Sequence, residues 1–71
     1  MTHEKFALVL RQLREERGWS QEQLAERADL NRSYIGEVER GQAIPSIVTV
    51  AKLANALEMQ LSLLIARCEN I

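Results

Sequence analysis

The sequence predicts an all-α domain of five short helices, and three observations lead to this prediction. Apolar residues recur at helical spacing, as Phe6, Leu10 and Leu13 do near the N-terminus. Residues that begin or end helices, chiefly Ser, Asn and Gly, separate the apolar segments at short intervals. The chain has one Pro, one Trp, one Tyr and one Phe, which argues against a β-sandwich or a β-barrel.

The first two helices are defined by their boundaries. The first helix should run from about Glu4 to Arg17 and end at Gly18, which accepts the left-handed conformation. Ser20 and Gln23 then form a capping box, in which each side chain accepts from the backbone N–H of the other residue. The second helix is short, from about Gln21 to Arg27.

The other three helices are predicted in the same way. Asn31 should cap a third helix from Arg32 to about Arg40, and Gly41 should end it. Ser46 should cap the fourth helix. Apolar stripes place the last two helices at about 47–57 and 61–68, with Cys68 on the inward stripe of the last one.

Length and composition limit the class of protein. The 71 residues fit one small domain, 1–71, whose core is marginal. One cysteine, Cys68, cannot form an internal disulfide, and with the single His3 it cannot complete a zinc site. We therefore expect no metal and no cofactor. No apolar run approaches the roughly 18 residues of a membrane helix, and no signal peptide is evident, so we expect a cytoplasmic protein without a membrane partner.

The charges are nearly balanced. Nine basic and ten acidic residues give a net charge of −1, so the total charge does not indicate binding to nucleic acid. Such binding would have to come from a local cluster of basic residues. We expect no enzyme, because no nucleophile–base pair, metal cluster or phosphate loop is recognisable, and no small-molecule ligand is evident.

The segment 21–40 has the packing pattern of two helices that cross at a tight turn. Asp29 falls where the turn requires a positive φ, which Asp tolerates better than most residues. Small or apolar residues occupy the positions that hold the two helices together: Ala25, Leu30, Ile35 and Val38. A capped corner in any small helical bundle is the alternative, and this combination favours a helix-turn-helix.

The stretch LRQLREERGWSQEQLAERADLNRSYIGEVERGQAIPSIVTVAKLANAL resembles the Cro/C1-type (XRE-family) helix-turn-helix domains, most of all the controller proteins of restriction–modification systems. NRSYIGEVERG and the downstream PSIVTVAKLANAL carry the resemblance, which covers Phe6 to about Ile65. It implies a five-helix, lambda-repressor-like domain that acts as a homodimer on a palindromic operator in double-stranded DNA. Repression and activation both remain open. The chain departs from the family at Asp29 and Glu58, where many relatives carry Gly, so the turn at Glu58 is expected to differ in shape.

The exposed side of the third helix should read the DNA. Arg32 can take guanine O6 and N7 in a bidentate pair, and Glu37 can accept from cytosine N4 or remain in solvent. Ser33 and Tyr34 complete the predicted base-reading set. The predicted phosphate ligands are Gln21, Arg40, Arg14 and Gln42. For Arg14 the resemblance also implies a salt bridge to Glu39.

A second apolar strip on the fifth helix predicts the dimer interface. Met59 and Leu63 should lie near its centre, with Ile71 at its end. If this strip fails, Leu8 and Val9 on the first helix are the next candidates. An alternative function is an antitoxin-like module that binds a protein partner and autoregulates its operon, although the sequence has no separate extension for such a partner.

Overall fold

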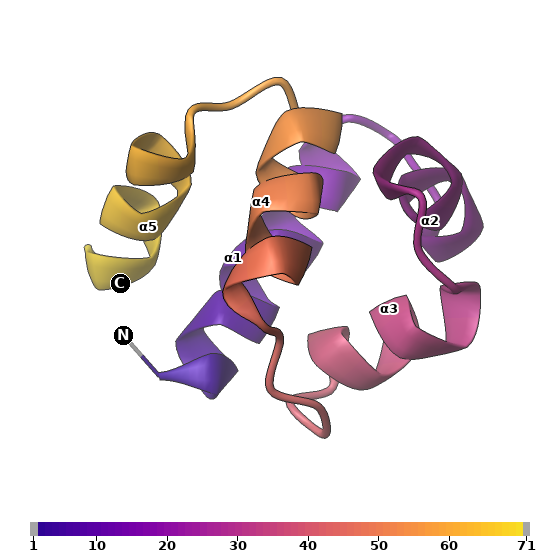
Figure 1. Ribbon diagram of the computed structural model, residues 1–71, viewed down its shortest axis with the longest axis horizontal. Coiled ribbons are helices and arrows are strands. Elements are labelled where there is room, and N and C mark those ends of the chain that lie inside the picture. The colour runs from indigo at the N-terminus through magenta and orange to yellow at the C-terminus, as the bar shows by residue number, and fades with distance from the viewer. Residues whose placement is uncertain (1, 71) are drawn as a thin grey trace.

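Five α-helices joined by short turns make up the computed structural model, which describes residues 2–70 (Figure 1). The helices are α1 His3–Glu16, α2 Gln21–Ala28, α3 Arg32–Glu39, α4 Ile47–Ala56 and α5 Leu61–Glu69. No boundary differs from its predicted position by more than one residue. The described residues contain no β-strand, and the predicted all-α, five-helix fold is confirmed.

The predicted caps are formed as local hydrogen bonds. Ser20 Oγ accepts from the Gln23 N–H at 3.1 Å, and Gln23 Oε1 accepts from the Ser20 N–H at 2.8 Å. Asn31 Oδ1 accepts from the Ser33 N–H at 2.7 Å, and Ser46 Oγ accepts from the Thr49 N–H at 3.2 Å. Because each bond joins residues two or three apart, the sequence alone was enough to predict them.

Helices α1 and α4 run through the middle of the molecule in the view of Figure 1, and all five helices contribute side chains to the core. The α2–α3 unit covers one side of this pair, where α2 contacts α4 and α3 contacts α1. Helix α5 covers the other side and contacts both α1 and α4. The largest fully buried side chains come from all five helices and the end of α4: Phe6, Leu10, Leu13, Leu24, Ile35, Leu53, Leu57 and Leu64.

Two residues other than glycine adopt positive φ, both at helix ends. Asp29 ends α2 at φ 56°, as predicted. Glu58 follows α4 at φ 57°, the left-handed region that a glycine would occupy. Glu58 therefore adopts a backbone conformation that a glycine would also accept, and whether the turn differs in shape from that of relatives stays a prediction. The N–H of Met59 reaches back to the carbonyl of Ala54 at 2.9 Å, which closes the end of the helix.

No single helix within residues 2–70 is long and apolar enough to cross a membrane; α4 and α5 meet the length and composition requirement only as a pair bent by 103°. Within the same residues, no three His, Cys, Asp or Glu side chains are grouped so that they could hold a metal ion.

Candidate nucleic-acid interface

The solvent-facing side of α3 presents polar side chains. Arg32, Ser33 and Glu37 are all exposed, and the Asn31 cap fixes where the helix begins. The Arg32 guanidinium lies 3.7 Å from a Glu22 carboxylate oxygen, but both side chains are more than 60% exposed. Such an exposed pair is weak, so Arg32 is free to exchange this partner for a ligand.

Tyr34 differs from its neighbours on α3 because it is only half exposed. It packs against the hydrophobic core, and its hydroxyl donates to Thr49 Oγ1 on α4 at 3.5 Å. Thr49 also accepts from the Ser46 hydroxyl at 3.1 Å. The Tyr34 hydroxyl therefore has a partner inside the domain, while the exposed part of the side chain remains available for an external contact.

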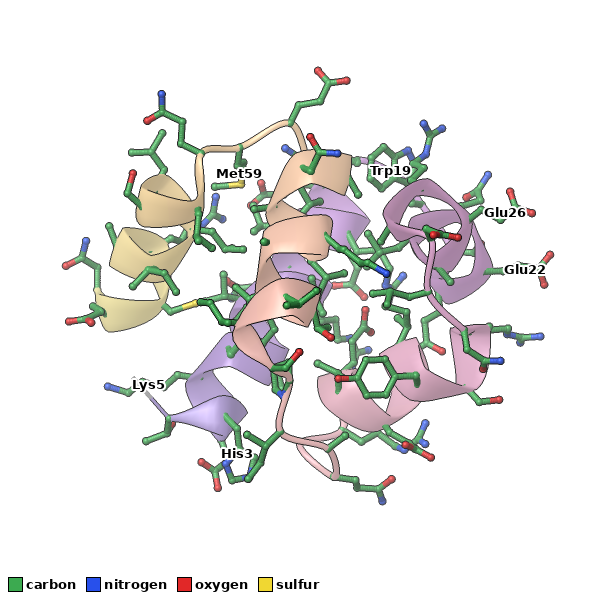
Figure 2. The ribbon with its side chains drawn as sticks, viewed as in Figure 1. His3, Lys5, Trp19, Glu22, Glu26 and Met59 are labelled. Atoms are coloured by element: carbon green, nitrogen blue, oxygen red, sulfur yellow. The ribbon has the colours of Figure 1, made fainter. Side chains whose placement is uncertain are left out.

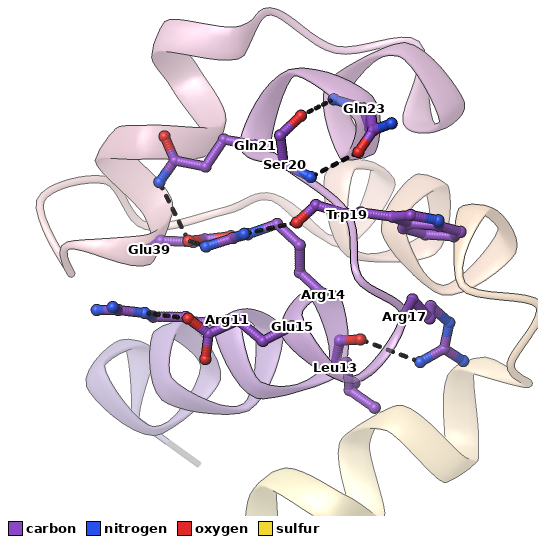
Figure 3. A network of polar contacts seen from close by, with 10 residues as sticks. All are labelled: Arg11, Leu13, Arg14, Glu15, Arg17, Trp19, Ser20, Gln21, Gln23 and Glu39. Carbon is purple, nitrogen blue, oxygen red and sulfur yellow. Dashed lines mark hydrogen bonds and ion pairs between the residues drawn. The ribbon is translucent and has the colours of Figure 1, made fainter.

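Beneath α3, an ion pair ties three helices together (Figure 3). Arg14 on α1 donates to both carboxylate oxygens of Glu39, from Nε at 2.8 Å and from Nη2 at 3.0 Å, and its Nη1 donates to the Trp19 carbonyl at 2.8 Å. The two side chains are 12% and 3% exposed, respectively. The hydrogen bond to Glu39 raises the pKa of the Arg14 guanidinium. The expected Arg14–Glu39 salt bridge is confirmed.

This ion pair also orients the first residue of α2. Gln21 Nε2 donates to Glu39 Oε1 at 3.1 Å, as Figure 3 shows. Glu39 thereby receives hydrogen bonds from both α1 and α2 and fixes the Gln21 amide at the surface. Arg14, in contrast, donates hydrogen bonds to Glu39 and to the Trp19 carbonyl inside the domain. Its main visible role is therefore to hold Glu39 and the chain before α2 in place.

The other two predicted phosphate ligands lie together at the end of α3. Arg40 and Gln42 are both exposed, and Arg40 Nε donates to Gln42 Oε1 at 3.1 Å. The structure thus brings Gln21, Arg40 and Gln42 to the edge of the surface that contains Arg32, Ser33 and Glu37, while it places Arg14 below that surface.

The predicted dimer residues differ in how far they are exposed. Leu63 on α5 is 57% exposed. Met59, in the turn before α5, packs partly against the core of its own chain (Figure 2). Ile71 lies outside the described residues. Of the two reserve candidates, Leu8 is exposed, but Val9 is fully buried and is wrong as a contact residue, because it faces the core side of α1.

Sequence reasoning missed two features. Ile44, Ile47 and Val48 form an exposed apolar patch before and at the start of α4. The positions of Ile47 and Val48 could have indicated it, since the buried residues of α4 are at 49, 50, 53 and 54. The second feature is Gly36, which lies buried in the middle of α3. Its spacing of four residues from Arg40 was the available signal.

Comparison with known proteins supports the resemblance. A family model described as "Helix-turn-helix" matches residues 10–64. The restriction-modification controller protein C.AhdI from Aeromonas hydrophila is 48% identical; its crystal structure matches with a TM-score of 0.83 over 87% of this chain and 94% of that one. Control protein C.BamHI from Bacillus amyloliquefaciens is 39% identical over 56 residues, which are 78% of this chain and 69% of that protein.

A longer relative matches over part of its length. The HTH-type transcriptional regulator SutR from Escherichia coli (strain K12) is 37% identical over 61 residues, or 86% of this chain. These residues make up 34% of SutR, so the chain spans about a third of that regulator. The match therefore concerns the domain that the two proteins share.

Proposed function

This chain belongs to the helix-turn-helix family of the Cro/C1 type, and we propose from this premise that it is a sequence-specific DNA-binding regulator of transcription. The observation that carries the proposal is the exposed side of α3. There Arg32, Ser33 and Glu37 are exposed on a helix that packs against α1 and α2. A DNA operator as ligand implies that the protein acts in the cytoplasm.

Each exposed residue has a role that its chemistry suits. Arg32 reads guanine in the major groove, because a guanidinium matches the O6 and N7 acceptors. Glu37 accepts from cytosine N4. Its negative charge weakens binding in any register that would bring the carboxylate next to a phosphate. Ser33 contacts a base edge, and the exposed part of the Tyr34 ring packs on a sugar or a thymine methyl group.

The surrounding polar residues bind the DNA backbone. Gln21, Arg40 and Gln42 contact phosphate oxygens and set the register of α3 in the groove. Arg14 contributes through Glu39, which holds Gln21 in place. These contacts supply affinity for any sequence, whereas the contacts of Arg32 and Glu37 supply discrimination between sequences.

The operator is a palindrome bound by a homodimer. This chain matches the controller protein C.AhdI over most of both lengths. We therefore prefer control of a restriction–modification locus as the role of this regulator. Two α3 helices related by a two-fold axis enter successive major grooves about 34 Å apart. The dimer forms through α5, with the exposed Leu63 near the axis and Met59 beside it.

Selection from a random pool of duplex DNA tests this function. We expect enrichment of an inverted repeat whose half-sites are about one helical turn apart. Binding to the enriched site should weaken with salt as expected for about 4–8 phosphate contacts per dimer, because few cations surround α3. Failure to enrich any sequence, with binding no tighter than to random duplex, would remove the proposal of sequence-specific recognition.

A further inference from the structure

Gly36 occupies a position where glycine has no conformational advantage. It lies inside α3 and has no positive φ, unlike Gly18 and Gly41, which end helices. Glycine is among the least favourable residues in the interior of a helix, and alanine is the most favourable. Its presence in α3 therefore calls for a close approach by another group.

The groups that approach Gly36 are two of the predicted phosphate ligands. A Cβ atom added at Gly36 would lie 2.9 Å from Arg40 Nη1 and 3.7 Å from Arg40 Cζ, closer than carbon and nitrogen can normally approach in the first case. It would lie 3.5 Å from Gln21 Oε1, which is an ordinary contact. The missing side chain thus makes room for the Arg40 guanidinium beside the Gln21 amide.

Both of these groups are held from their other side. Gln21 Nε2 donates to Glu39 Oε1, and Glu39 is fixed by Arg14. Arg40 Nε donates to Gln42 Oε1 at 3.1 Å. A guanidinium from the end of α3 and an amide from the start of α2 are therefore brought together over the bare backbone of Gly36. Each keeps N–H groups beyond those that these bonds use.

We propose that Gly36 is a positioning residue for DNA binding, because it lets Arg40 and Gln21 converge into one clamp for a single backbone phosphate. The inference rests on the proposed function, which supplies the phosphate. The clamp joins α2 to α3 through one anion, so it fixes the orientation of the recognition helix as well as adding affinity.

Gly36→Ala tests the clamp, because its effects on folding and on binding have opposite signs. The Cβ meets the far end of a flexible side chain, so Arg40 moves aside and the helix gains from alanine. We expect an unfolding temperature equal to or above that of the wild type. We expect affinity for both the selected operator and a random duplex to fall about tenfold per subunit, or about a hundredfold for the dimer, as for loss of one charged hydrogen bond in each subunit. The salt slope should fall by about 2 per dimer.

A double-mutant cycle with Arg40→Ala separates this role from a structural one. Without the Arg40 guanidinium nothing remains for the Cβ to displace, so Gly36→Ala should cause no further loss of affinity in the Arg40→Ala background. Asn55→Ala is the matched control, because it also places alanine in a helix, at an exposed position on α4. It should leave DNA binding unchanged.

The outcomes distinguish the clamp from the proposed function. If the wild type binds DNA and Arg40→Ala weakens binding while Gly36→Ala does not, the clamp is wrong and the function stands. Equal losses from Gly36→Ala in both backgrounds, or a Gly36→Ala protein that fails to fold, would also overturn the clamp. A wild-type protein that binds no DNA would overturn the function, and the clamp with it.

Discussion

Arg32 is the residue on which sequence discrimination should depend most. Its side chain is 68% exposed at the first turn of α3, and the Glu22 carboxylate, which lies 3.7 Å from its guanidinium, is itself exposed. Arg32→Ala should therefore lose about 1–3 kcal/mol of specific binding and relax the preference at one operator position. Titration of the selected operator and its single-base variants at fixed salt measures both effects.

Arg40→Ala is the comparison for Arg32→Ala, because both remove one exposed arginine from α3 or its end. A phosphate ligand carries no sequence information, so its loss should weaken all sequences alike. If Arg32→Ala also weakens every sequence equally, Arg32 binds the backbone and the reading of bases belongs to other residues.

Cys68 is fully buried on α5, and this burial raises the pKa of its thiol. The folded protein thus keeps the thiol neutral at a pH where the unfolded chain ionises it. The corresponding stabilisation is complete below the ordinary thiol pKa of 9.0 and is lost as the pH rises toward the folded value. We expect slow labelling by a thiol reagent at pH 8, with a rate that increases in denaturant in step with unfolding.

The alkaline loss of stability should be smaller in Cys68→Ala than in the wild type, because the variant has no thiol to ionise. Unfolding temperatures at pH 8 and pH 10 give this comparison. Rapid labelling of the folded wild type under native conditions would mean that the thiol is accessible, contrary to its burial in the core.

Single residues were predictable where their role is local or follows a family pattern. The positive φ of Asp29 follows from the tight turn between two helices, and the Arg14–Glu39 pair follows from the resemblance. The role of Gly36 was not predictable in this way. It depends on where the Arg40 side chain folds back and on Gln21, which belongs to another helix.

At the scale of helices, the Arg14–Glu39 pair is the main polar link among α1, α2 and α3. Removal of Arg14 would leave the Glu39 carboxylate buried without an opposite charge, with only the Gln21 amide as a hydrogen-bond donor. Arg14→Met should therefore destabilise the domain by about 3–5 kcal/mol, since the Glu39 carboxylate is only 3% exposed. Chemical denaturation, with a stabilising osmolyte if the variant is partly unfolded, measures the loss.

Arg11→Met is the matched control, because it makes the same replacement about one turn before Arg14, on an exposed part of α1. Arg11 pairs with Glu15 at 3.2 Å, and both side chains are more than half exposed. Its loss should change stability by no more than about 0.5 kcal/mol. Arg14→Met with Glu39→Leu should recover much of the stability. Equal effects of Arg11→Met and Arg14→Met would show that the buried pair does not link the helices.

The helices themselves were predictable to within a residue because their signals are contained in the segments that form them. Caps at Ser20, Asn31 and Ser46 act over two or three residues. The turn at Glu58 was expected to differ in shape from that of relatives with Gly, because Glu disfavours left-handed φ. The buried Leu57 and the bond from the Met59 N–H to Ala54 nevertheless impose that conformation. Here tertiary packing outweighs the local preference of one residue.

For the whole molecule, the sequence predicts which side chains form the core better than it predicts which exposed ones meet a partner. Leu63 lies off the inward stripe of α5 and is exposed, as expected. Ile47 and Val48 are likewise exposed apolar side chains, at the start of α4. A helical pattern identifies a side chain as outward-facing. Whether a second copy of the chain covers it depends on the shape of two surfaces, which the pattern does not contain.

Leu63→Glu tests the assembly proposed through α5. Because Leu63 is 57% exposed in the single chain, the substitution should leave the monomer folded. In a two-fold dimer it would bring two carboxylates together near the axis, where burial of like charges is unfavourable. We therefore expect a monomer at micromolar concentration in sedimentation, with operator affinity greatly reduced, since one subunit holds only one half-site.

Val48→Glu makes the same change in the apolar patch at the start of α4, where the side chain is 63% exposed. With the interface on α5, this variant should remain dimeric, as should Asn55→Glu, which adds a carboxylate at an exposed polar position. A dimeric Leu63→Glu protein beside a monomeric Val48→Glu protein would move the interface to the start of α4. If both stay dimeric, Leu8 on α1 becomes the position to test, because it is the remaining large apolar side chain that α1 exposes.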